Sequence, residues 1–131
     1  MTTKEIITAY YDAFNRGDTD AMCALLASDV AHHVNEGSVR HGIDAFREFS
    51  AHMTACYKET LTDIVIFVEG DRAAAEFTVN GAYLADDDGL PPANGQTYKL
   101  PGGAFFALKD GKITRVTTYY NLSDWIAQVA G

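Results

Sequence analysis

Positive charge is scarce in this sequence. Ten Lys and Arg side chains stand against 18 Asp and Glu side chains, and the formal net charge is −8. Nucleic acids and anionic membrane surfaces select basic patches. We therefore expect neither nucleic acid nor a membrane among the partners of this protein.

Cysteines and long apolar runs are scarce as well. Cys23 and Cys56 are the two cysteines, and both lie in helix-like patterns, where a cysteine usually behaves as a small core side chain. No stretch approaches the length of a bilayer span, and no apolar run follows a basic cap at the N-terminus. We expect two free thiols and a cytoplasmic location.

What is present is the balance of an ordinary globular protein. Hydrophobic residues make up 47% of the chain and charged residues 21%, which argues against a disordered or fibrous protein. The 131 residues suffice for one core and are too few for two. The sequence therefore predicts a single domain over residues 1–131.

The first half of the chain has helical patterns. Thr2 and Glu5 have the spacing of a capping box, and apolar residues then recur at helical intervals until Gly17. Asp18 can cap a short second helix, and a third helix opens near Gly42 with apolar residues spaced for one buried face as far as Tyr57.

The second half has the period of strands, with tight-turn signals at Gly70-Asp71 and Asp110-Gly111. One short strand is expected earlier, and a last short helix at 123–129. The predicted strands are 29–34, 61–69, 72–84, 97–109 and 112–121.

Helices followed by an antiparallel meander predict an α+β fold, in which a curved sheet wraps around the N-terminal helices to form a cone. Strands this long must curl if both layers are to bury their apolar faces. Pro101-Gly102-Gly103 has the composition of a bulge or kink that such curling needs.

Several phrases in this order are found together in one known family. They are residues 10–18 on the first helix and its turn, Asp29-Val30, His41-Gly42 and residues 110–113. With them the whole chain resembles the nuclear transport factor 2-like superfamily, in particular its ketosteroid isomerase-related and SnoaL-like polyketide cyclase branches. The resemblance implies the cone fold, which hosts enzymes, binding modules and assembly domains.

The isomerases of that superfamily hold a carbonyl oxygen with a tyrosine and a protonated carboxylic acid, and a second carboxylate moves the proton. The resemblance places Tyr10 at the position of their tyrosine. It places Val34 at the position of the base, and Gly103 or Ala104 near the position of the acid. Because both carboxylates are missing, the resemblance does not imply ketosteroid isomerase activity.

Strand parity sorts the candidate pocket residues, because alternate side chains face opposite sides of a sheet. If Val34 points into the cone, His32 does too. The predicted lining is apolar and aromatic with a few polar tips, as small-molecule sites usually are. Its members are Tyr10, His32, Asn35, Phe77, Val79, Thr118, Tyr120 and Trp125.

His32 is the candidate general base or acid, because it is the inward group whose ordinary pKa lies near neutrality. Tyr10 is the candidate hydrogen-bond donor to a carbonyl or enolate oxygen. A second interpretation makes His32 a structural histidine in the core and Tyr10 a wall of the pocket.

The sequence predicts neither a metal site nor a cofactor. His32 and His33 are adjacent and point to opposite faces of a strand, so they cannot share one metal ion. The segment Asp86-Asp87-Asp88-Gly89 lacks the spaced ligands of a calcium loop, and a solvated hairpin tip is expected there.

Three hypotheses about function remain open. The first is an isomerase or cyclase that moves protons on a small, largely apolar carbonyl compound. The second is a binding module that holds an apolar metabolite without converting it, and the third is a dimerisation domain with a relic pocket. Apolar side chains expected on the outer sheet face, such as Tyr119, predict a homodimer through the sheets.

Overall fold

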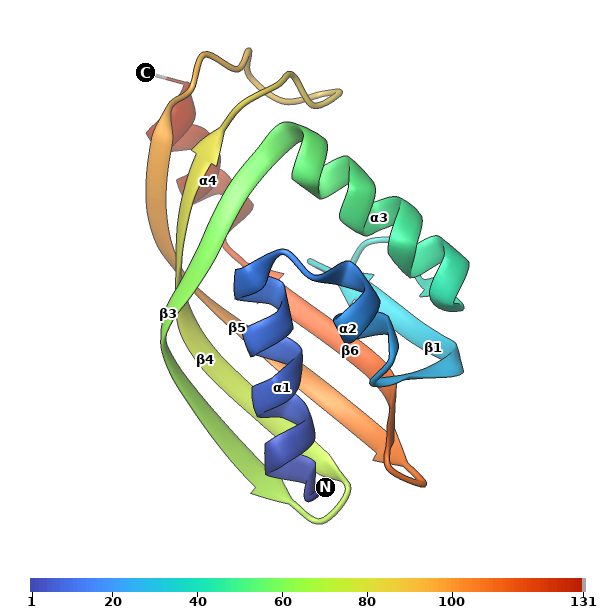
Figure 1. Cartoon of the computed structure of the whole chain (residues 1–131). Helices are drawn as coiled ribbons and strands as arrows, with labels where there is room; N and C mark the ends of the chain where they lie inside the picture. The colour runs from blue at the N-terminus through green and yellow to red at the C-terminus, as the bar shows by residue number, and fades with distance from the viewer. Residues whose placement is uncertain (131) are drawn as a thin grey trace.

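The computed structural model describes residues 1–130 and has the α+β architecture that the sequence predicts. Four helices accompany a six-stranded sheet of order β2-β1-β6-β5-β4-β3. The sheet curves around α1 and α3 and does not close into a barrel (Figure 1). The helices are α1 (Thr3–Arg16), α2 (Thr19–Cys23), α3 (Ile43–Cys56) and α4 (Leu122–Val129). The strands are β1 (Leu26–Val34), β2 (Arg40–His41), β3 (Tyr57–Glu69), β4 (Arg72–Tyr83), β5 (Thr97–Lys109) and β6 (Lys112–Tyr120).

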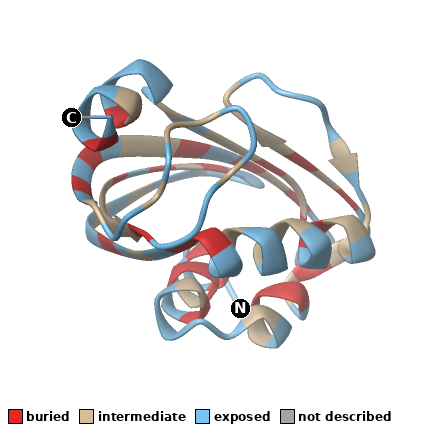
Figure 2. Cartoon of the chain, turned by 90° about the horizontal axis from the view of Figure 1, so that it is seen from above, coloured by how far each residue is buried: buried red, intermediate tan, exposed pale blue. Residues whose placement is uncertain are grey.

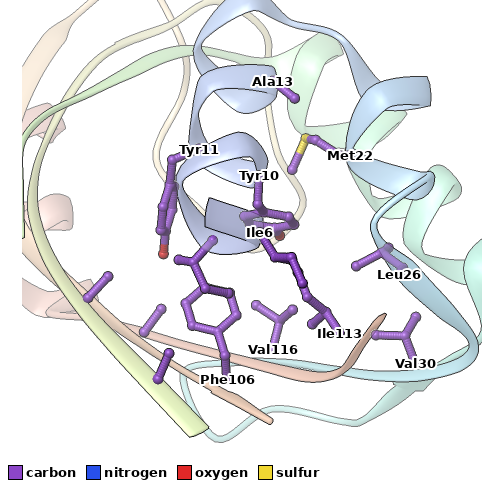
Figure 3. Packing of buried hydrophobic residues seen from close by; sticks show 14 of the residues in the cluster. Ile6, Tyr10, Tyr11, Ala13, Met22, Leu26, Val30, Phe106, Ile113 and Val116 are labelled. Atoms are coloured by element: carbon purple, nitrogen blue, oxygen red, sulfur yellow. The ribbon is translucent and has the colours of Figure 1, made fainter. Parts of the chain in front are cut away.

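Helix α1 follows from local signals at both ends. The Thr2 hydroxyl accepts a hydrogen bond from the Glu5 backbone N–H, and the Glu5 side chain accepts one from the Thr2 backbone N–H. The helix ends at Gly17, whose φ of 71° lies in the left-handed region that favours glycine. Its apolar face packs into the concave side of the sheet, where Tyr10 and Tyr11 meet Phe106 (Figure 3).

The long strands β3 to β6 pair antiparallel in sequence order, and β1 joins the far side of β6 in parallel. Strand β3 begins at Tyr57 and not at residue 61 as expected. Helix α3 ends at Cys56, and Tyr57 already has extended backbone angles, φ −136° and ψ 152°. Tyr57 is therefore the first residue of a strand and not the last turn of a helix.

The bulges that interrupt the ladders lie elsewhere than predicted. The β4/β5 and β5/β6 registers run unbroken through Gly102 and Gly103, so of the predicted bulge or kink the bulge is wrong. One register shift lies in β3 between Thr62 and Val65, beside Asp63 with its positive φ of 54°. The missing side chain at Gly102 instead leaves room for Phe77, because a Cβ there would lie 2.6 Å from a ring carbon of Phe77.

Buried residues gather in two clusters on the concave side of the sheet (Figure 2). The larger lies under α1 and α2, and the smaller surrounds Trp125 of α4. Cys23 and Cys56 are both buried and free, as expected. No helix within residues 1–130 is long and apolar enough to cross a membrane.

Candidate ligand pocket

A cavity of about 860 Å³ lies between the helices and the concave face of the sheet. This volume suits a small organic ligand. The cavity takes its walls from α1, α3, α4 and the inner face of the sheet. Seven of the eight residues predicted from the sequence line it, namely Tyr10, His32, Phe77, Val79, Thr118, Tyr120 and Trp125.

Asn35 is the exception and has a structural position instead. Its side-chain oxygen accepts a hydrogen bond from the Tyr120 backbone N–H at 2.7 Å. The backbone N–H of Asn35 donates to the Thr118 carbonyl at 2.9 Å. Asn35 thereby extends the pairing of β1 with β6 just beyond Val34, and it does not belong to the cavity lining.

His32 is a buried imidazole in aromatic surroundings. The ring is 5% exposed and meets the rings of Phe46 and Phe49 at 5.2 and 4.9 Å between centroids. Its Nδ1 has no hydrogen-bond partner among residues 1–130. Burial, and then the charges of Arg40 and His33, lower the pKa of His32 to about 4. The imidazole is therefore neutral at pH 7 and a weak base.

Tyr10 packs against the same Phe46 ring as His32 does, at 6.4 Å between centroids. The Tyr10 ring also meets Tyr11 and Phe106 edge to face, at 5.4 and 5.7 Å. Burial raises the pKa of Tyr10 above its ordinary value, so the phenol keeps its proton and can donate a hydrogen bond. We call this region, Tyr10 with His32, Phe46 and Phe49, the histidine end of the cavity.

A half-buried carboxyl group, that of Glu59, lies elsewhere in the same cavity. The Tyr98 hydroxyl donates to Glu59 Oε2 at 2.5 Å, although β4 lies between their strands. Glu59 faces Gly81 on β4, and Gly81 faces Tyr98 on β5. A Cβ at Gly81 would overlap the Tyr98 ring. The missing side chain therefore lets the tyrosine reach across the middle strand to the carboxyl group.

The surroundings of Glu59 favour its protonated form. Burial raises the pKa of Glu59, and the hydrogen bond from Tyr98 opposes part of that rise. Burial, followed by the charges of Glu59 and Asp87, also raises the pKa of Tyr120, which shows that this phenol is close to both carboxyl groups. The Trp125 ring packs on Tyr98 at 5.7 Å. Glu59, Tyr98, Tyr120 and Trp125 form what we call the carboxyl end.

A second carboxyl group, Asp87, borders this end. The Tyr57 hydroxyl donates to Asp87 Oδ2 at 2.6 Å, and His52 Nε2 lies 2.9 Å from Oδ1. The Asp87 backbone N–H donates to the Tyr83 hydroxyl at 3.0 Å. The side chain of Asp87 is 19% exposed. The expectation of a solvated hairpin tip is therefore wrong at this residue, because the loop folds back onto α3 and the pocket.

The sequence reasoning missed the carboxyl end for one reason in particular. Tyr57, Glu59 and Leu61 alternate on one face of β3, and Leu61 is a core residue. Parity would have placed Glu59 inside the cone if the strand had been expected to begin at Tyr57. The contact with Tyr98 also depends on Gly81, which carries no signal of its own in the sequence.

Comparisons with family models and with solved structures both find proteins similar to this chain. The sequence matches the family model of the SnoaL-like domain over residues 7–116. A solved structure from a Silicibacter species is 63% identical, with 98% of this chain and 96% of that chain covered and a TM-score of 0.97. One from Pseudomonas putida is 57% identical, with 99% of each chain covered and a TM-score of 0.97. Both are described as candidate polyketide cyclases.

A more distant structure, that of TerC co-crystallised with polyporic acid, is 21% identical and covers 98% of each chain with a TM-score of 0.84. At this identity the likeness concerns the fold. No curated protein matches the sequence.

Proposed function

Since the chain belongs to the SnoaL-like domain family of the nuclear transport factor 2-like superfamily, we propose that it is a cyclase or isomerase that moves a proton on a small, largely apolar carbonyl compound. The observation that supports this best is the Glu59 carboxyl group, which is half-buried in the cavity, has a raised pKa and accepts a hydrogen bond from Tyr98. A proton carrier works best when its pKa approaches the working pH.

Glu59 has the arrangement of a positioned acid and base. Oε2 of Glu59 accepts the hydrogen bond from the Tyr98 hydroxyl, while Oε1 has no hydrogen-bond partner among residues 1–130. In the proposed reaction the carboxylate takes a proton from the carbon next to the substrate carbonyl, and the electron pair of that C–H bond forms an enolate. Returning the proton to another carbon completes an isomerisation. In a cyclase the enolate carbon bonds to a second carbonyl carbon, and the oxygen of that carbonyl takes the proton.

The other pocket residues have supporting roles in this proposal. Phe77, Val79 and Trp125 hold the apolar body of the substrate, with Thr118 beside them. Neutral groups donate hydrogen bonds to the enolate oxygen, and the candidates are the phenol of Tyr120 and, at the histidine end, Tyr10 and the neutral His32. His32 thus changes from the proton carrier of the sequence-based hypothesis to a hydrogen-bond donor, because its pKa is too low for an effective base.

The test is proton exchange in D₂O. Enolisable aromatic and cyclic ketones are incubated with the protein, and loss of the α-proton signal is followed by NMR. Glu59→Gln is expected to slow exchange by about 10² to 10⁴-fold while ketone binding persists. The matched control is Glu69→Gln, which alters an exposed carboxyl group on the same strand and leaves the rate unchanged. If Glu59→Gln kept full activity and His32→Gln lost it, the proton carrier would be His32 and not Glu59.

A non-catalytic binding module is the second candidate. The specific observation in its favour is the aromatic character of the lining around His32, where Phe46 and Phe49 leave a weakly basic imidazole. This function predicts that native mass spectrometry of the purified protein detects a retained apolar compound. It also predicts no exchange in either the wild type or the Glu59→Gln variant.

We also propose a homodimer through the outer sheet face. Phe67, Ala74 and Phe105 lie side by side across β3, β4 and β5, and Phe67 and Phe105 are 56% and 49% exposed. Tyr119 packs edge to face on Phe105 at 6.0 Å and extends this patch onto β6. Exposed apolar rows of this kind are costly in water unless a partner covers them.

Sedimentation velocity tests the dimer. Phe105→Asp places a charge in the centre of the patch and is expected to give a folded monomer. Lys109→Asp, an exposed change at the end of the same strand, should leave the dimer intact. A wild-type monomer at micromolar concentration, or a dimer that survives Phe105→Asp, would contradict the proposed interface.

A further inference from the structure

The geometry points to a binding site for a thiophilic divalent cation of the Zn²⁺ class, formed by His52, Cys56 and Asp87. One ligand atom from each side chain lies within 4.8 Å of the other two. Three atoms at such spacing leave a point roughly 2.8 Å or less from each of them, compared with metal–ligand bonds of about 2.0 to 2.3 Å. Adjustments below about 1 Å per side chain would therefore bring the three atoms to bonding distance of one ion. This site is independent of the proposed enzymatic function.

Two of the ligands come from one face of a helix. His52 and Cys56 are four residues apart in the last turns of α3, so their side chains lie one above the other. The third ligand comes from the segment between β4 and β5. His52 Nε2 and Asp87 Oδ1 are already 2.9 Å apart, and the Cys56 thiol at the end of α3 donates to the carbonyl oxygen of Asp86, the residue before Asp87, at 3.7 Å.

The backbone holds the two ligand-bearing segments together without a metal ion. The Cys56 carbonyl accepts hydrogen bonds from the N–H groups of Leu84 and Ala85, at 2.7 and 3.3 Å. The Tyr83 hydroxyl donates to the Pro91 carbonyl at 2.7 Å and accepts from Asp87 N–H. Preformed spacing of this kind lowers the ordering cost of binding an ion. It also means that the protein folds before the ion arrives.

The chemical nature of the three ligand atoms determines which metal ion the site prefers. A thiolate, an imidazole and a carboxylate together suit Zn²⁺ and disfavour Mg²⁺ and Ca²⁺, which prefer oxygen ligands. The Tyr57 hydroxyl binds Asp87 Oδ2 at 2.6 Å and leaves Oδ1 for the metal, as a supporting shell around a ligand does. Asp86 and Asp88 add negative charge nearby.

Access to the site is open on one side. The His52 side chain is 51% exposed, and both His52 and Asp87 line the cavity. Three protein ligands leave a fourth position for water or for an oxygen atom of a pocket ligand. No metal site was predicted from the sequence, because only the adjacent histidines His32 and His33 and the loop 86–89 were considered, and the helix and the loop that meet here are distant in the sequence.

Cobalt binding tests the proposal, because Co²⁺ bound by a thiolate has a characteristic charge-transfer absorption. Tag-free full-length protein is stripped of metal and titrated with Co²⁺ and then with Zn²⁺. We expect one Co²⁺ per chain, with the thiolate band, and its displacement by Zn²⁺. No saturable binding, or binding without the thiolate band, would overturn the site.

Variants identify the ligands. Cys56→Ser should abolish the thiolate band, and Cys23→Ser, which alters the other buried cysteine, should retain it. His52→Gln changes a half-exposed side chain, so this variant should fold even if Cys56→Ser does not, and its affinity should fall at least tenfold. Tyr57→Phe, which loosens the supporting shell, should weaken binding about 10 to 100-fold. Unchanged affinity in His52→Gln would contradict the proposal.

Discussion

The two ends of the cavity withdraw opposite kinds of titratable group from water, since His32 is buried at one end and Glu59 is half-buried at the other. At the histidine end burial disfavours the imidazolium and lowers the pKa of His32. At the carboxyl end burial disfavours the carboxylate and raises the pKa of Glu59. The same desolvation therefore makes a base weaker and an acid weaker as well. The comparison favours the carboxyl end for proton transfer, because a raised carboxyl pKa moves toward neutral pH and a lowered imidazole pKa moves away from it.

Acid titration of His32 is expected to have the largest effect on stability. Its pKa is about 4 in the folded protein against an ordinary value of 6.5, so the unfolded chain binds the proton more tightly. Stability is then unaffected above pH 6.5 and falls as the pH drops from 6.5 to 4, by about 3 kcal/mol in total. Urea unfolding across this range should show that loss in the wild type and not in His32→Gln.

His33→Gln is the control for this titration, because its side chain lies on the opposite face of β1 and His32 remains in place. It should keep most of the wild-type dependence on pH, because the charge of His33 is the smallest of the three causes that lower the pKa of His32. If His32→Gln loses stability below pH 6.5 as steeply as the wild type does, the histidine end is not the source of the acid sensitivity.

Gly81→Ala tests how the carboxyl end is built. The new Cβ would overlap the Tyr98 ring, so the tyrosine must leave its position over β4 and give up its hydrogen bond to Glu59. Overpacking of this kind costs about 1 to 3 kcal/mol, measured as a change in the free energy of unfolding. Gly103→Ala, where the new Cβ would meet the Ala75 carbonyl at 3.4 Å, should cost less. Equal costs would mean that Gly81 has no special relation to Tyr98.

Glu59→Gln should show the smallest effect on stability and the opposite dependence on pH from His32. The folded protein binds the Glu59 proton more tightly than the unfolded chain, whose value is near 4.5. The stability of the wild type relative to Glu59→Gln should therefore decline as the pH rises from 4.5 through the folded-state pKa. Chemical unfolding of both proteins measures the difference. A relative stability that rises with pH would show that the carboxylate is favoured in the fold.

Local patterns along the chain predicted much of this structure. The capping box of Thr2 and Glu5 begins α1 as expected. Strand parity placed His32 and Thr118 in the same interior, where both line the cavity. Such features depend on neighbours a few residues apart, and their periods can be read from one segment at a time.

At the end of α3, local sequence patterns do not decide where the helix ends and the strand begins. Tyr57 fits the apolar spacing of the helix and also the parity of β3, and only packing against Tyr83, with rings stacked at 5.3 Å, decides for the strand. If Tyr57 belongs to the helix, the strand is predicted to begin at residue 61, and Glu59 lies outside it and outside the predicted pocket lining. The position of one element boundary thus concealed the acid on which the proposed chemistry depends.

The sequence by itself determined the α+β class, the family and a minor part of the apolar pocket lining, because amphipathic periods and turn residues act over short distances. Only the tertiary structure decided which polar groups meet. Glu59 and Tyr98 are 39 residues apart in the chain, and His52 and Asp87 are 35 apart. Their contacts arise from strand register, a missing side chain at Gly81 and a folded-back loop. Hydrogen bonds and pKa values depend on such distances in space, which no single segment of the sequence contains.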